Sequence, residues 1–142
     1  VTNVRLPQLN KLTSEYLEKL DLRYQVQFND DLTATIYSFD KEMGVSGISS
    51  GEEERIGMAL SWAFRSLFEK MHYEINFYGI DERIDAGLDG AGVERAVSFL
   101  YEMANLEKKN IFLISHKKEI LDYASRVMLV KRKGHFSEVT YE

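Results

Sequence analysis

The sequence predicts an α/β fold: a mostly parallel sheet flanked by helices, with an N-terminal helix and a β-hairpin before it. From residue 75 onward, short apolar runs alternate with helical segments, which is typical of parallel strands with covered faces. Ahead of them, a segment with leucines at helical spacing precedes two runs of alternating apolar and polar residues. With 142 residues, 44% of them hydrophobic, the chain can form one domain with a real core.

The first half is expected to contain a helix at 7–20, a hairpin at 22–39, a loop at 40–50 and a long helix from about Gly51 to Met71. Pro7 is tolerated in a first helical turn, and "NDD" is a turn between the two alternating runs. The helical face of the first segment consists of Leu9, Leu12, Tyr16, Leu17 and Leu20. That of the long helix consists of Ile56, Ala59, Leu60, Ala63 and Leu67. Trp62 and Phe64 lie off this face.

In the second half, strands are expected at Ile75–Ile80, Ile111–Ser115 and Arg126–Arg132, with helices at Gly90–Leu106 and Lys117–Tyr123. A turn at Lys133 and Gly134 then leads into a last edge strand, "HFSEVTY".

Composition excludes several classes of function. The absence of cysteine excludes a disulfide scaffold, a thiolate zinc site and a cysteine nucleophile within this span. No apolar run approaches the roughly 20 residues that cross a bilayer, so we expect a soluble, cytoplasmic protein. The net charge of −5 argues against a module that coats nucleic acid. Residues 107–135 nevertheless carry eight bases and three acids, so this basic end either faces phosphate or is a solvated surface.

The stretch "GISSGEEERIG", residues 47–57, has two interpretations. Ser50 and Glu53 fit a capping box, in which each side chain covers a backbone N–H group at a helix start. Alternatively, the N–H groups and positive dipole end of an exposed helix start bind phosphate.

Polar side chains follow the apolar strands, where open α/β sheets place their ligands. The strand at 75–80 ends in Asp81 and Glu82, and two carboxylates there suit a hard cation such as Mg²⁺ and the polarisation of a water molecule. A surface turn is the alternative. Asp89 precedes the next helix and is either a helix cap or a site residue, and His116 at the end of the next strand is either structural or catalytic.

These features occur in an order that resembles the C-terminal half of an ABC-type ATPase. "ISSGE", residues 48–52, looks like the signature motif, "INFYGIDE" like Walker B, "AGLD" like the D-loop, and His116 like the switch histidine. Arg83 follows the acidic pair, where ABC transporters have proline. The leucine-rich first helix and the Glu-x-x-Arg from Glu52 to Arg55 instead resemble SbcC-type, SMC-like DNA-repair ATPases. Departures from the family pattern are Ser50, in place of the first signature glycine, and Asn76 and Gly79, which make the Walker B strand less apolar.

The resemblance implies ATP and Mg²⁺ as cofactors and a role for each motif residue. Asp81 would hold the metal, Glu82 would be the general base, and His116 would sense the γ-phosphate. The helix start that Ser50 caps would also face a nucleotide bound to a second copy, in an ATP-dependent head-to-head dimer. The residues implied in nucleotide binding are Ser49, Ser50, Gly51, Glu52 and Asp89.

The sequence contains no G-x-x-x-x-G-K-[ST] motif, so the phosphate-cradling P-loop is expected outside it. We therefore expect residues 1–142 to be a single C-terminal lobe: 1–21 ends a returning coiled coil, 22–39 is the hairpin, and 48–142 carries the four motifs. The partners implied are an N-terminal P-loop lobe, a second copy, a nuclease subunit and DNA, with no membrane. By itself, the segment is expected to be inactive.

Two other functions remain open. One is an SMC-like clamp, in which nucleotide controls DNA entrapment without a nuclease. The other is an interaction module with no activity of its own.

Overall fold

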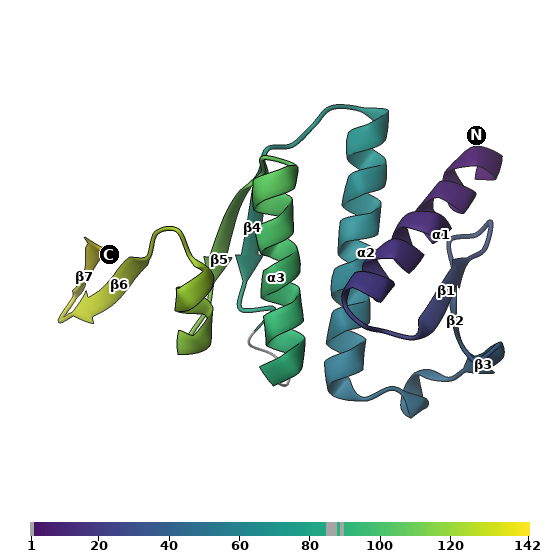
Figure 1. The fold of residues 1–142 in the computed structure, drawn as a ribbon, viewed down its shortest axis with the longest axis horizontal. Coiled ribbons are helices and arrows are strands. Elements are labelled where there is room, and N and C mark those ends of the chain that lie inside the picture. Colours follow the sequence, from purple (N-terminus) through teal and green to yellow (C-terminus); the bar gives the residue numbers. More distant parts are fainter. Residues whose placement is uncertain (1, 85–87, 89) are drawn as a thin grey trace.

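The computed structural model describes residues 2–84, 88 and 90–142 (Figure 1). The elements, in chain order, are α1 (Thr2–Lys19), β1 (Tyr24–Phe28), β2 (Ala34–Ser38), β3 (Lys41–Met43), the 3₁₀ turn η1 (Val45–Gly47), α2 (Ser50–Met71), β4 (Phe77–Asp81), α3 (Gly90–Leu106), β5 (Asn110–Ile114), the 3₁₀ helix η2 (Lys118–Tyr123), β6 (Met128–Lys133) and β7 (Phe136–Tyr141). Helix α2 stands between α1 with its neighbouring strands and the layer formed by α3, β4 and β5 (Figure 1). None of the described helices is long and apolar enough to cross a membrane.

The core lies where the three long helices meet. Trp62 of α2 and Phe99 of α3 have ring centroids 4.6 Å apart, and Tyr16 of α1 packs edge-on against both rings. The Tyr16 hydroxyl also lies 2.6 Å from Oγ of Ser66, which gives this buried polar group a partner. Four of the five residues expected on the inner face of α2 are buried, and Leu60 packs partly buried against the core. Trp62, off that face, connects α2 to α3.

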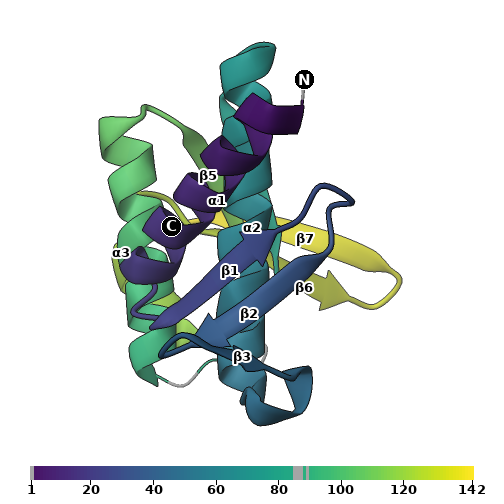
Figure 2. The ribbon, with the colours of Figure 1, turned by 90° about the vertical axis from the view of Figure 1, so that its right-hand side faces the viewer.

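The N-terminal strands form an antiparallel sheet in the order β1-β2-β3, with Val26 opposite Ile36 and Ile36 opposite Met43. Helix α1 packs on α2 and on β1, and Figure 2 shows the sheet lying across this pair of helices. Val26 and Phe28 of β1 are buried. The predicted hairpin is therefore confirmed, and β3 extends it by one strand, in a segment that was expected to be a loop.

The expectation of a mostly parallel sheet is wrong for this chain. Among the described residues, β4 and β5 are the parallel pair, with Phe77 opposite Asn110 and Asp81 opposite Ile114. The third expected strand, β6, pairs antiparallel with β7 and not with β5. A short turn through Gly134, whose φ is +66°, lets β6 and β7 pair locally, whereas parallel pairing requires a long crossover connection.

Two helices also differ from expectation. Helix α1 begins at Thr2, so Pro7 lies inside it and not in its first turn. Proline removes one backbone donor there, and the helix continues because its leucines Leu9, Leu12 and Leu17 are buried in the core. The segment expected as a helix at 117–123 is the 3₁₀ helix η2. Among the described side chains of η2, Ile120 is the one that belongs to the core, and a single buried residue gives too little apolar contact to support a longer helix.

Candidate functional site

The carboxyl ends of β4 and β5 bring together three of the predicted site residues. The parallel register places Asp81 opposite Ile114, and the backbone N–H of Glu82 donates to the carbonyl of Ile114 at 2.9 Å. The chain then carries His116 beside the strand end, where its Nε2 lies 2.8 Å from Oε1 of Glu82. Asp81, Glu82 and His116 thus gather at the strand edge where ligands of open α/β sheets bind.

The backbone at Glu82 is held in an uncommon conformation. Its φ is +51°, in the left-handed region that costs a non-glycine residue about 1 kcal/mol or more. The hydrogen bond to Ile114 fixes this turn directly after the strand. The side chains of Glu82 and His116 are 56% and 82% exposed, so both face solvent and are accessible to a ligand.

The start of α2 is a capping box, but one residue earlier than the sequence predicted. Ser49, not Ser50, is the N-cap: its side chain accepts from the backbone N–H of Glu52, and Glu52 accepts from the backbone N–H of Ser49 at 3.0 Å. The Ser49 hydroxyl also donates to Oε2 of Glu52 at 2.6 Å. The capping pair is therefore Ser49 with Glu52, and the predicted pair of Ser50 with Glu53 is wrong. Both serines fit the cap spacing, and the backbone conformation selects Ser49.

Tyr24 on β1 completes this cluster. Its hydroxyl donates to Oε1 of Glu52 at 2.9 Å, which ties the hairpin to the start of α2. The hydrogen bonds from Ser49, followed by the one from Tyr24, hold the pKa of the Glu52 carboxyl below its usual value. Burial, followed by the hydrogen bond to Glu52, raises the pKa of Tyr24.

The start of α2 is also connected to the end of β4. Nη1 of Arg83, the residue after Glu82, lies 3.7 Å from Oε2 of Glu54 in the first turns of α2. A Cβ at Gly57 would lie 3.6 Å from Nη2 of Arg83, so the guanidinium runs along this part of α2. Figure 1 shows the same relationship at the level of the fold: β4 and β5 run toward the end of the molecule at which α2 and α3 begin.

The other predicted site residues take different positions. Ser50 and Gly51 are the first two residues of α2, and the Ser50 side chain is exposed. Asp89, expected in a D-loop, lies outside the described residues, as do Asp85, Ala86 and Gly87 of the same segment. No cluster of three histidine or acidic side chains able to hold a metal ion occurs among the residues that the structure describes. Any metal held at Asp81 would therefore take most of its ligands from elsewhere.

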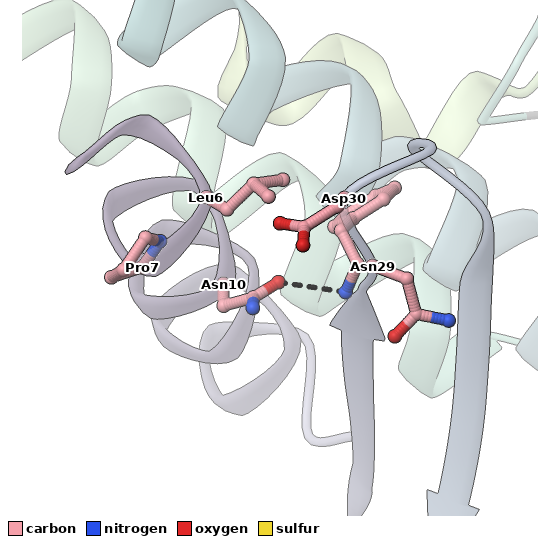
Figure 3. Close-up of a pocket in the computed structure, with 6 residues that line it drawn as sticks. Leu6, Pro7, Asn10, Asn29 and Asp30 are labelled. Atoms are coloured by element: carbon pink, nitrogen blue, oxygen red, sulfur yellow. Dashed lines mark hydrogen bonds between the residues drawn. The ribbon is translucent and has the colours of Figure 1, made fainter. Parts of the chain in front are cut away.

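A hollow lies away from these residues, between α1 and the turn that joins β1 to β2 (Figure 3). Its volume is about 420 Å³, and the residues that line it are Leu6, Pro7, Asn10, Phe28, Asn29 and Asp30. The side-chain oxygen of Asn10 accepts a hydrogen bond from the backbone N–H of Phe28 at 2.9 Å. This bond holds α1 to β1, and we assign the hollow no ligand.

Tyr24 and Glu54 were not predicted as site residues. Tyr24 is part of an alternating strand pattern, and Glu54 is one of three consecutive acids at a helix start. Neither pattern indicates a contact with a distant element. Arg83 stood out in the sequence by its departure from the family pattern, directly after the acidic pair, but nothing in the sequence indicated its contact with Glu54.

Sequence comparison relates the chain to two phage proteins. It is 27% identical over 137 residues to exonuclease subunit 2 of Escherichia phage RB69, which covers 95% of this chain and 24% of that protein. It is 26% identical over 134 residues to exonuclease subunit 2 of Enterobacteria phage T4, covering 93% of this chain and 23% of the relative. The chain thus spans about a quarter of the length of the relatives it matches. No protein-family model matches the chain.

The fold matches solved structures of SMC proteins. One, from work on ATP-driven dimerization and DNA-stimulated activation of SMC ATPases, superposes with a TM-score of 0.81 at 18% identity, covering 100% of this chain and 89% of that one. The SMC head domain from Thermotoga maritima matches with a TM-score of 0.69 at 22% identity, over 94% of this chain and 46% of that domain. These likenesses establish the fold.

The motifs in the sequence resemble those of one member of the SbcC-type group, the ATPase subunit of the T-even phage recombination endonuclease. The two phage matches confirm that resemblance. Over nearly its whole length, the chain is therefore similar in sequence to SbcC-like phage exonuclease subunit 2, and its fold is that of the matching part of SMC head domains.

Proposed function

We propose that residues 1–142 are the C-terminal lobe of an ATPase subunit in a nuclease complex that repairs or recombines broken DNA. The observation that carries the proposal is the contact between Glu82 and His116 at the ends of two parallel strands. The similarity of the chain to phage exonuclease subunit 2 supports the choice of ATPase class. Because the chain spans about a quarter of those relatives, the P-loop lobe and the coiled coil would lie outside residues 1–142.

In this proposal, Glu82 positions the attacking water and accepts its proton. Its carboxylate is exposed on a backbone turn that the hydrogen bond to Ile114 holds in place. His116 orients the carboxylate through its 2.8 Å contact and lies where a γ-phosphate could be sensed. Phosphoryl transfer depends mainly on positioning and charge stabilisation, and this pair supplies positioning.

Asp81 would hold Mg²⁺. It is exposed at the last position of β4, next to Glu82, and its carboxylate is an oxygen ligand of the kind that Mg²⁺ prefers. One carboxylate with no further ligand cluster in the described residues suits this ion, which commonly keeps waters and phosphate oxygens as its remaining ligands. When bound, the ion would neutralise charge on the phosphate oxygens.

The start of α2 would contact the nucleotide of a second copy. Ser49, Ser50 and Gly51 stand at the N-terminus of a 22-residue helix, and the dipole of a helix favours phosphate at this end. Glu52 would hold Ser49 in place through the capping box. ATP would then join two heads, and Asp89 would cross their interface. ATP hydrolysis would regulate a nuclease subunit that acts on DNA ends.

ATP turnover by the full-length protein, measured with DNA present, tests this proposal. We expect Glu82→Gln to bind ATP like the wild type but to hydrolyse it at least about 100-fold more slowly, because the general base is lost. Residues 1–142 alone are expected to hydrolyse no ATP. The matched control is Glu74→Gln, which removes an exposed carboxylate outside the site and should leave turnover unchanged. Normal turnover by Glu82→Gln would overturn the assignment.

A second candidate function is an ATP-gated DNA clamp without a nuclease. The likeness of the fold to SMC head domains favours it. The two functions differ in what the purified complex does to DNA. ATP-dependent cleavage at DNA ends supports the nuclease complex, whereas retention of circular DNA that is released when the circle is cut supports the clamp.

A further inference from the structure

Arg83 and Glu54 form a loose ion pair between the end of β4 and the first turns of α2. Nη1 of Arg83 lies 3.7 Å from Oε2 of Glu54, beyond the 2.7–2.9 Å of a charge-assisted hydrogen bond. Oε2 of Glu54 is shielded from solvent, and it has no hydrogen-bond partner among the described residues. A shielded carboxylate oxygen without a hydrogen bond is unfavourable, so a shorter contact with Arg83 would stabilise the protein.

The two ends of this pair belong to different parts of the proposed site. Arg83 directly follows Glu82, whose left-handed backbone and bond to Ile114 fix where the chain leaves β4. Glu54 lies two residues after Glu52, which the capping box joins to Ser49. A shift of α2 relative to β4 by about 1 Å is enough to change the pair from an ion pair to a hydrogen-bonded one.

The path for such a shift is open. Gly57 has no side chain, and a Cβ there would stand in ordinary contact with Nη2 of Arg83. The Arg83 side chain is 57% exposed and that of Glu54 is 30% exposed, so the guanidinium can move without unpacking the core. The first turn of α2 is meanwhile held from its other side by Tyr24.

We propose that Arg83 is a positioning residue that couples the two half-sites of one head. When the start of α2 engages the nucleotide of the second copy, Glu54 closes on Arg83, and the closed pair fixes the turn that presents Glu82 to the head's own nucleotide. This inference rests on the proposed function. It assigns a role to Arg83, the position at which the sequence departs from the proline of ABC transporters.

The test is the ATP dependence of steady-state turnover by the full-length protein. For the wild type, the rate of hydrolysis is expected to depend cooperatively on ATP concentration, because each head contacts both nucleotides. Arg83→Ala is expected to remove the cooperativity and to lower kcat about 10-fold, the effect of losing one charge-assisted hydrogen bond, with little change in ATP binding. The exchange variant Arg83→Glu with Glu54→Arg is expected to recover both. A purely structural ion pair would also recover by exchange, but its loss in Arg83→Ala would lower stability and leave cooperativity in ATP unchanged, so cooperativity is the readout that separates the two roles.

Two controls separate the possible failures. Lys11→Ala removes an ion pair of similar length, 3.8 Å from Glu15 on the exposed face of α1, and should leave cooperativity unchanged. Glu82→Gln reports on the proposed function: if it hydrolyses ATP normally, the ATPase assignment itself fails. If Glu82→Gln is inactive but wild type is not cooperative, or Arg83→Ala keeps wild-type cooperativity, or the exchange variant recovers nothing, the coupling role alone is overturned.

Discussion

Nε2 of His116 lies 2.8 Å from Oε1 of Glu82, although 34 residues separate them in the chain. The parallel pairing of β4 with β5 produces this contact, since Asp81 stands opposite Ile114, and Glu82 and His116 follow the two strand ends at the same edge of the pair. A strand end that presents a carboxylate and an imidazole together has the geometry for orienting a water molecule.

The first prediction concerns His116. His116→Ala in the full-length protein is expected to lower kcat for ATP hydrolysis roughly 100-fold, because Glu82 loses the group that orients it, while the ATP concentration for half-maximal rate changes little. Steady-state kinetics measures both. His135→Ala, an exposed histidine in the turn between β6 and β7, is the matched control and should behave like wild type. Equal losses in both variants would exclude a specific role for His116.

The second prediction separates the two serines before α2. Ser49→Ala is expected to lower the free energy of unfolding by about 1 kcal/mol, since it removes the cap that accepts from the N–H of Glu52. Ser50→Ala is expected to be nearly neutral, because Ser50 lies inside the helix with its side chain exposed. Urea denaturation measures the difference. Equal losses of unfolding free energy in Ser49→Ala and Ser50→Ala would contradict the assignment of Ser49 as the cap.

The third prediction follows from the lowered pKa of Glu52. Because the pKa of the folded state lies below the usual 4.5, the ionised carboxylate stabilises the protein above pH 4.5, and this contribution is lost as the pH falls through the folded-state pKa. The Tm difference between wild type and Glu52→Gln should therefore be largest near neutral pH and should shrink in acid. Glu53→Gln removes a charge from the same turn but none of these hydrogen bonds, and it should show a smaller difference at neutral pH.

The fourth prediction concerns the core. Trp62→Ala is expected to lower the free energy of unfolding by about 3–5 kcal/mol, because the indole packs on Phe99 and Tyr16 where three helices meet. Phe64→Ala, two residues along the helix and 44% exposed, should cost about 1–2 kcal/mol. Thermal unfolding followed by circular dichroism compares them. A larger loss of unfolding free energy for Phe64→Ala than for Trp62→Ala would contradict the assignment of the Trp62 side of α2 to the core.

Much of the fold is predictable because the relevant signals are local. The apolar spacing from Ile56 to Leu67 predicts the buried face of α2, and the alternation around Val26 predicts the hairpin. The turn at Lys133 and Gly134 and the strand after it were predicted, but the separation of β6 from the parallel pair could not be predicted in the same way. An apolar run does not specify its neighbour, and a short turn at Gly134 favoured local antiparallel pairing over a parallel partner.

By itself, the sequence determined which side chains stand at the strand ends and helix start, because chain order and periodicity place Asp81, Glu82 and His116 directly after apolar runs. The tertiary structure alone decided which side chains interact. Ser49 and not Ser50 caps α2, Tyr24 donates a hydrogen bond to Glu52, and Arg83 forms an ion pair with Glu54. The physical reason is the distance along the chain over which each kind of signal acts. Periodicity reflects neighbours a few residues apart, whereas hydrogen bonds and ion pairs require a few ångströms between elements whose relative positions only packing sets.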